Sequence, residues 1–238
     1  MKAKVKRYLS VAVASIPAGK PIVFWDTCAI LELLRLSERS AFPERDFLHY
    51  SFLAEKIKSG EIVSVTSELV FQEFHQHYFQ QLKALQKLEQ KTRDDVKKIT
   101  AIMPIGKKRK RIEDNVDSMH TETRITLILS QIWRNTILIR EQKSFLNFAY
   151  LRVKLKMAPS QNKEQFKDSY IWGTFLSLAH KLPACPKMCF FSLNISDYQE
   201  PGTNNLCAQI RTDLQVLPNA EVFLILGKLF GVLKQLFP

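Results

Sequence analysis

Four acidic residues lie near the expected ends of secondary-structure elements: Asp26, Glu73, Asp168 and Asp197. Carboxylate oxygens are hard ligands, and a few of them suffice to hold Mg²⁺ or Mn²⁺. Such a cation can neutralise a phosphodiester, lower the pKa of a bound water and stabilise the leaving oxygen. Without a cation, clustered carboxylates repel one another and raise one another's pKa. Because the chain has 23 acidic residues, an alternative stays open, in which these four cap helices and charge the surface.

Alternating strand and helix signals position these acids. The apolar run 21–25, PIVFW, predicts a strand buried on both faces that ends at Asp26. Ser67, with Thr66 as the rival, is expected to cap the long helix that carries Glu73, and Gly60 is expected to end the helix before it. Further strands are expected at 61–65, 188–193 and 214–217, and helices at 28–36, 44–59, 68–103, within 118–156, at 166–180 and from 219.

This order predicts an α/β protein with a central parallel β-sheet flanked by helices. Sites in such sheets lie beyond the carboxyl ends of the strands. Asp26 ends the first strand and Asp197 follows the third, while Asp168 begins the helix that leads into the third. The topology can therefore bring the acids together.

The positive charge of the chain is concentrated in one third of it. The whole chain carries +12, and residues 81–160 alone hold 18 Lys or Arg against 8 Asp or Glu. A solvated helical face would account for this excess, but we favour a surface that binds a polyanion, nucleic acid before membrane. The segment contains an unbroken basic run, expected in an exposed loop and to bind nucleic acid: Lys107, Lys108, Arg109, Lys110 and Arg111.

Bulk properties favour a single cytoplasmic domain. A length of 238 residues fits one large domain, or one domain with an insertion. The four cysteines match no common zinc spacing, so reduced thiols are expected. The N-terminus resembles a signal peptide, but we interpret it as an amphipathic lead-in to the first strand. No stretch is long enough to span a bilayer, and the apolar tail 221–238 is expected to form a packed helix or a self-association surface.

Four segments, in order, resemble the motifs of PIN domains. The first is IVFWDTCAIL at 22–31, a strand ending in Asp-Thr before an apolar helix, and the second is VSVTSELVFQE at 63–73. The third is FKDSYI at 166–171, and the fourth is FFSLNISDY at 190–198, a strand followed by Ser-x-Asn-x-x-Asp and an aromatic residue. In the second motif Glu68 competes with Glu73; we favour Glu73, which lies one to two turns into the helix.

The resemblance implies a PIN-like fold and a metal-dependent endoribonuclease, in which metal-activated water cleaves RNA, as in VapC-type toxins of toxin–antitoxin or defence systems. Asp26, Glu73, Asp168 and Asp197 would then be catalytic ligands of Mg²⁺ or Mn²⁺, supported by Thr27 and Asn194. It also implies RNA as the substrate, with DNA as the alternative. The expected protein partners are an antitoxin and a second copy of the chain, and no membrane partner is expected.

The resemblance covers residues 20–80 and 160–238 of a single domain, 1–238, and leaves 81–160 as a basic helical insertion. Two other functions remain open: a non-catalytic adaptor that binds RNA on a PIN scaffold, and a DNA-directed or structure-specific nuclease.

Overall fold

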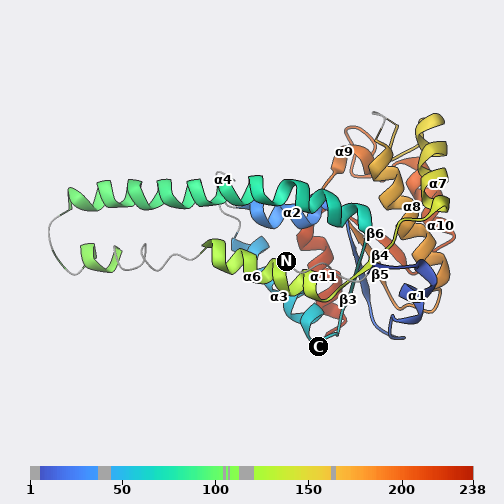
Figure 1. Cartoon of the computed structure of the whole chain (residues 1–238), viewed down its shortest axis with the longest axis horizontal. Helices are drawn as coiled ribbons and strands as arrows, with labels where there is room; N and C mark the ends of the chain where they lie inside the picture. Colours follow the sequence, from blue (N-terminus) through green and yellow to red (C-terminus); the bar gives the residue numbers. More distant parts are fainter. Residues whose placement is uncertain are drawn as a thin grey trace.

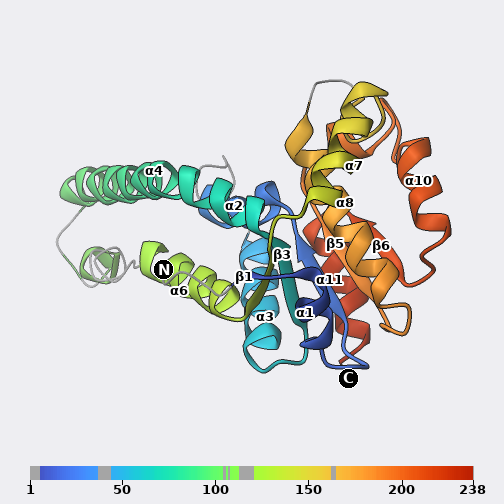
Figure 2. The same ribbon diagram turned by 45° about the vertical axis from the view of Figure 1, so that its right-hand side comes forward.

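A six-stranded sheet, parallel throughout, forms the centre of the molecule (Figures 1 and 2). The structure, a computed structural model, describes residues 6–36, 44–103, 106, 108–112, 121–161 and 165–237. The strand order is β1-β4-β3-β2-β5-β6. The strands are β1 (Lys6–Arg7), β2 (Ile22–Trp25), β3 (Val63–Ser67), β4 (Thr136–Ile139), β5 (Met188–Phe191) and β6 (Ala220–Phe223).

Helices cover both faces of this sheet, which confirms the predicted α/β class (Figure 2). Helices α2, α3, α6 and α11 pack together on one side, and α1, α7 and α8 lie on the other. The helices are α1 (Leu9–Ala14), α2 (Thr27–Arg35), α3 (Glu44–Lys58), α4 (Glu68–Ala101), α6 (Thr121–Arg134), α7 (Lys143–Lys154), α8 (Phe166–Lys181), α9 (Ile195–Tyr198), α10 (Ala208–Gln215) and α11 (Leu226–Gln235). Within the described ranges, no helix combines the length and apolar composition needed to cross a membrane.

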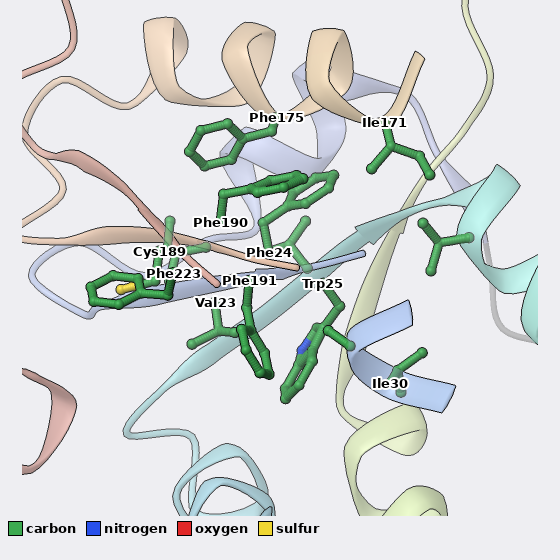
Figure 3. Packing of buried hydrophobic residues seen from close by; sticks show 14 of the residues in the cluster. Val23, Phe24, Trp25, Ile30, Ile171, Phe175, Cys189, Phe190, Phe191 and Phe223 are labelled. Atoms are coloured by element: carbon green, nitrogen blue, oxygen red, sulfur yellow. The ribbon is translucent and has the colours of Figure 1, made fainter. Parts of the chain in front are cut away.

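The aromatic core explains why the central strands are continuously apolar. Successive side chains of a strand point to opposite faces, so a strand covered on both sides needs apolar residues at every position. Figure 3 shows Phe24 and Phe190 on the side of Phe175 in α8, and Trp25 and Phe191 on the opposite side. Phe24 and Phe190 stack with ring centroids 5.9 Å apart, and both strands are fully buried.

Local signals set the ends of two elements as predicted. Ser67 caps α4, because its hydroxyl oxygen accepts a hydrogen bond from the backbone N–H of Val70 at 3.2 Å. Gly60 follows α3 with a φ of +73°, a left-handed conformation that glycine adopts without strain.

The segment 81–160 differs from the all-helical insertion that the sequence suggested. It contains β4, which pairs with both β1 and β3 inside the sheet. It also contains α6, which packs on α3, and α7, which packs on α8. The outer part of α4 and the short helical stretch 108–112 project from the body of the molecule (Figure 1). Much of the segment is therefore part of the α/β core.

Three local predictions were wrong. The expected strand at 214–217 is the end of α10, and the edge strand β6 begins at Ala220. The C-terminal helix consequently starts at Leu226, and not near residue 219. In the basic run expected as a loop, residues 108–112 are helical, while Lys107 lies outside the described residues.

The apolar C-terminal helix packs within its own chain. Leu226, Leu229 and Leu233 of α11 are buried, and α11 contacts α3, β5 and β6. These side chains, which suggested self-association, are therefore already covered.

Candidate acidic site at the carboxyl edge of the sheet

The sheet reverses its order of winding at β2. From β2 the chain continues to β3 on one side and later returns to β5 on the other. A crevice beyond the carboxyl ends of the strands forms at such a switch point. Asp26 directly follows β2, and Asp197 lies in α9 after β5.

Asp26 is held rigidly by three groups. The carboxylate accepts hydrogen bonds from the backbone N–H of Thr27 at 2.6 Å and from the hydroxyl of Ser192 at 2.6 Å. The thiol of Cys28 lies 3.2 Å from its second oxygen. Asp26 is only 2% exposed, and these contacts fix its carboxylate in one orientation.

Glu73 approaches Asp26 from α4. Its Oε2 accepts a hydrogen bond from the Thr27 hydroxyl at 2.6 Å, and its Oε1 forms an ion pair with Lys167 Nζ at 2.7 Å. Thr27 therefore donates its backbone N–H to one acid and its hydroxyl to another, which ties α2 to α4.

Glu68 lies apart from this group. Lys6 donates a hydrogen bond to its Oε1, and the backbone N–H of Glu141 donates to its Oε2 at 3.2 Å. These partners belong to the β1 and β4 side of the sheet. Of the two glutamates considered from the sequence, Glu73 is the one that the structure places beside Asp26.

Asp197 and Asp168 form the other half of the cluster. Asn194 donates a side-chain hydrogen bond to Asp197 Oδ2, and the Ser196 hydroxyl donates to Oδ1 at 3.2 Å. Asp168, in the first turn of α8, lies close enough to Asp197 for the two carboxylates to interact, and this proximity helps to raise the pKa of Asp168.

Burial and mutual repulsion raise the pKa of two of the acids. Burial raises the pKa of Asp26, against hydrogen bonds from Ser192, Cys28 and Thr27, and the charge of Glu73 adds to the rise. Burial, and after it the charges of Asp26, Asp197 and Glu73, raises the pKa of Asp168 to about 8. The structure thus brings all four predicted acids into one electrostatic group.

The donor chemistry of this group fits a hard divalent cation. It offers carboxylate oxygens whose mutual repulsion a cation would relieve. Among the described residues, however, no three acidic, His or Cys side chains are arranged to hold one ion together. The two oxygens of Glu73 are occupied by Lys167 and Thr27. Cation binding at Glu73 would therefore have to replace the Lys167 ammonium.

Sequence reasoning assigned no role to three neighbours of the acids. Ser192 orients Asp26 and was visible as the Ser of the fourth motif. Lys167 directly precedes Asp168 in the third motif, and its ammonium group pairs with Glu73. Cys28 lies between Asp26 and Ser192, and no spacing pattern pointed to it. By contrast, the basic residues 108–111 lie beyond α4 in the chain and away from these acids in Figure 1.

Fold and site together define an α/β protein with an acidic centre at the carboxyl edge of a parallel sheet. The pattern of the PIN domain family matches residues 23–198, well over half of the chain. The chain therefore belongs to the PIN domain family, whose members are in general nucleases. No curated protein and no solved structure matches the chain in the corresponding comparisons.

Without divalent cations, the stability of the protein is expected to fall as the pH rises from about 4 to about 8. Asp168 has an ordinary pKa of 3.8 when unfolded and a pKa of about 8 when folded, so the folded state holds the extra proton in this window. Stability falls with pH wherever the folded state binds more protons, by at most about 1.4 kcal/mol per pH unit for one group.

Thermal unfolding in EDTA at pH 5 to 8 measures this effect, with Asp168→Asn as the comparison. The amide cannot ionise, so the melting temperature of the variant should rise relative to the wild type by up to about 3–5 °C per pH unit. Parallel curves for the two proteins would contradict a protonated Asp168.

Proposed function

We propose that this protein is a metal-dependent endoribonuclease whose centre is Asp26, Glu73, Asp168 and Asp197. The observation that carries the proposal is the mutual electrostatic influence of four carboxylates, one directly after β2 and the others in α4, α8 and α9. Such a cluster destabilises the fold unless a cation compensates it, and its presence in a member of a nuclease family favours a catalytic use.

Mg²⁺ or Mn²⁺ at these carboxylates would supply charge neutralisation at the scissile phosphate and a lowered pKa for water. The chain's own groups prepare the carboxylates for this. Ser192 and the Thr27 backbone orient the carboxylate of Asp26, and the Thr27 hydroxyl fixes Glu73. Asn194 and Ser196 fix Asp197.

Lys167 has a second part in this proposal. Its side chain is 55% exposed, so it can leave Glu73 when a cation arrives and turn to a phosphate oxygen. RNA is preferred over DNA on the strength of the family resemblance, and a role as a toxin with an antitoxin partner remains part of the proposal.

Incubation of the purified protein with labelled single-stranded RNA, duplex RNA and single-stranded DNA, with Mg²⁺ or Mn²⁺, tests the proposal. We expect internal cleavage of RNA that stops in excess EDTA and returns when the cation is restored. Cleavage that persists in EDTA would overturn the metal dependence. Binding of RNA without cleavage under any divalent cation would select the non-catalytic adaptor, and faster cleavage of DNA would select a DNA-directed nuclease.

A further inference from the structure

Helix α4 connects the acidic cluster to the projecting part of the molecule without interruption. It runs for 34 residues, from Glu68 to Ala101, and Glu73 lies near its beginning. Figures 1 and 2 show its outer half extending away from the sheet. At a rise of about 1.5 Å per residue, positions on α4 lie at fixed distances from Glu73.

One face of α4 is polar from the cluster outward. Successive residues of a helix are rotated by about 100°, which places Gln80, Lys87 and Lys91 within about 40° of Glu73 around the helix. Gln76 and Lys83 lie at the margin of the same face. The two glutamines and three lysines of this face are exposed, whereas Phe74 and Leu85 on the opposite side of the helix are buried.

The charges on this face have one sign over its first half. Between Glu73 and Glu89 the sequence contains no acidic residue. Lys83, Lys87 and Lys91 form what we call the α4 lysine row, and within the described part of the chain none of them is in an ion pair. Farther out, Asp94 and Asp95 follow, and Lys98 pairs with Asp95 at 3.3 Å.

We infer that the α4 lysine row binds the phosphate backbone of the RNA substrate on one side of the cleaved bond. This inference rests on the proposed function. An unpaired row of exposed lysines matches the regular charge of a nucleic-acid backbone, and such contacts position a substrate without reading its sequence. Because Glu73 and the row share one continuous helix, a strand bound along α4 is directed to the acidic cluster.

The row also sets how far the substrate must extend. Lys83, Lys87 and Lys91 are 10, 14 and 18 residues from Glu73, or about 15, 21 and 27 Å along the axis. Phosphates of a stacked strand recur about every 3.4 Å, so these lysines meet phosphates about four to eight nucleotides from the cluster. RNA shorter than this cannot reach both the cluster and the row.

A pair of charge-matched variants tests the inference. Lys87→Gln/Lys91→Gln removes two charges from the row, and Lys58→Gln/Lys181→Gln removes two from exposed lysines at the ends of α3 and α8, beside the amino ends of the strands. Affinity for unstructured labelled RNAs of 6 and 24 nucleotides is measured in EDTA by fluorescence anisotropy over a range of salt concentrations.

For the 24-nucleotide RNA, we expect the row variant to lose about tenfold or more in affinity and its salt slope to fall by about 1.4, since each lost contact to a single strand removes about 0.7. The control variant should match the wild type on both RNAs. The inference fails if the row variant binds the long RNA like the control.

Cleavage assays with Mg²⁺ separate this inference from the proposed function. The wild-type kcat/KM should rise with RNA length up to a plateau, and the row variant should lose that rise while keeping its activity on the shortest RNA. If the wild type cleaves RNA at a rate that does not depend on RNA length, the inference about the α4 lysine row is wrong and the proposed nuclease function stands. Length-dependent binding without any cleavage would overturn the nuclease alone.

Discussion

Asp26→Asn and Asp168→Asn are each expected to lower the rate of RNA cleavage by at least about a thousandfold. Each substitution replaces a carboxylate of the cluster by an amide of nearly the same shape, which removes a negative charge and a strong cation ligand. Loss of several kcal/mol of charge stabilisation corresponds to this factor, because each 1.36 kcal/mol is tenfold in rate. Initial rates under saturating Mg²⁺ measure the effect.

Glu68→Gln is the matched control for this prediction. Glu68 lies on the same helix as Glu73, five residues earlier, and its partners are Lys6 and the Glu141 backbone. The variant should keep its cleavage rate within a few-fold of the wild type. RNA affinity in EDTA should be undiminished in both Asn variants, since they remove negative charge near the bound phosphates. Full activity in Asp26→Asn and Asp168→Asn would exclude the cluster as the catalytic centre.

Asp213→Ala is expected to reduce the free energy of unfolding by about 3–5 kcal/mol, the usual cost of leaving a buried charge unpaired. The side chain of Arg152 is 4% exposed and forms an ion pair with Asp213, which also accepts a hydrogen bond from Trp172 Nε1 at 2.7 Å. This pairing joins α7, α8 and α10. Urea unfolding followed by circular dichroism measures the loss.

Two further variants identify the cause of this loss. Glu200→Ala breaks the pair with Arg211, 3.0 Å apart and more than a third exposed on both sides, and should cost less than about 1 kcal/mol. Arg152→Met combined with Asp213→Leu removes both charges and should recover most of the stability. If Asp213→Ala is no more costly than Glu200→Ala, the buried pair does not stabilise the fold as we expect.

The Asp213 pair also bears on the acidic site. Trp172 packs edge-on against Phe190 of β5, with ring centroids 5.2 Å apart, and against Tyr198 at 5.9 Å. Tyr198 is fully buried, and its pKa is raised by burial and then by the charges of Asp26 and Asp168. The aromatic layer under the cluster is thus connected to the ion pair through one tryptophan.

The sequence by itself determined the α/β class and the strands that carry the site. The apolar run that becomes β2, the cap at Ser67 and the stop at Gly60 are local features, in which a few neighbouring residues fix the backbone. The order of the four acids along the chain and the resemblance to PIN motifs suffice to identify them.

Only the tertiary structure decided which groups meet. The run Thr136–Ile139 is too short to distinguish from a helical segment by its pattern, and it becomes β4 because it pairs with β1 and β3, far away in sequence. Glu68 and Glu73 are chemically alike, and they differ because one faces Lys6 and the other faces Thr27 and Lys167. Hydrogen-bond and ion-pair partners come from distant parts of the chain, so no local pattern records them. The same holds for the α4 lysine row, whose lysines are visible in the sequence but whose distance from the acids depends on one helix continuing unbroken.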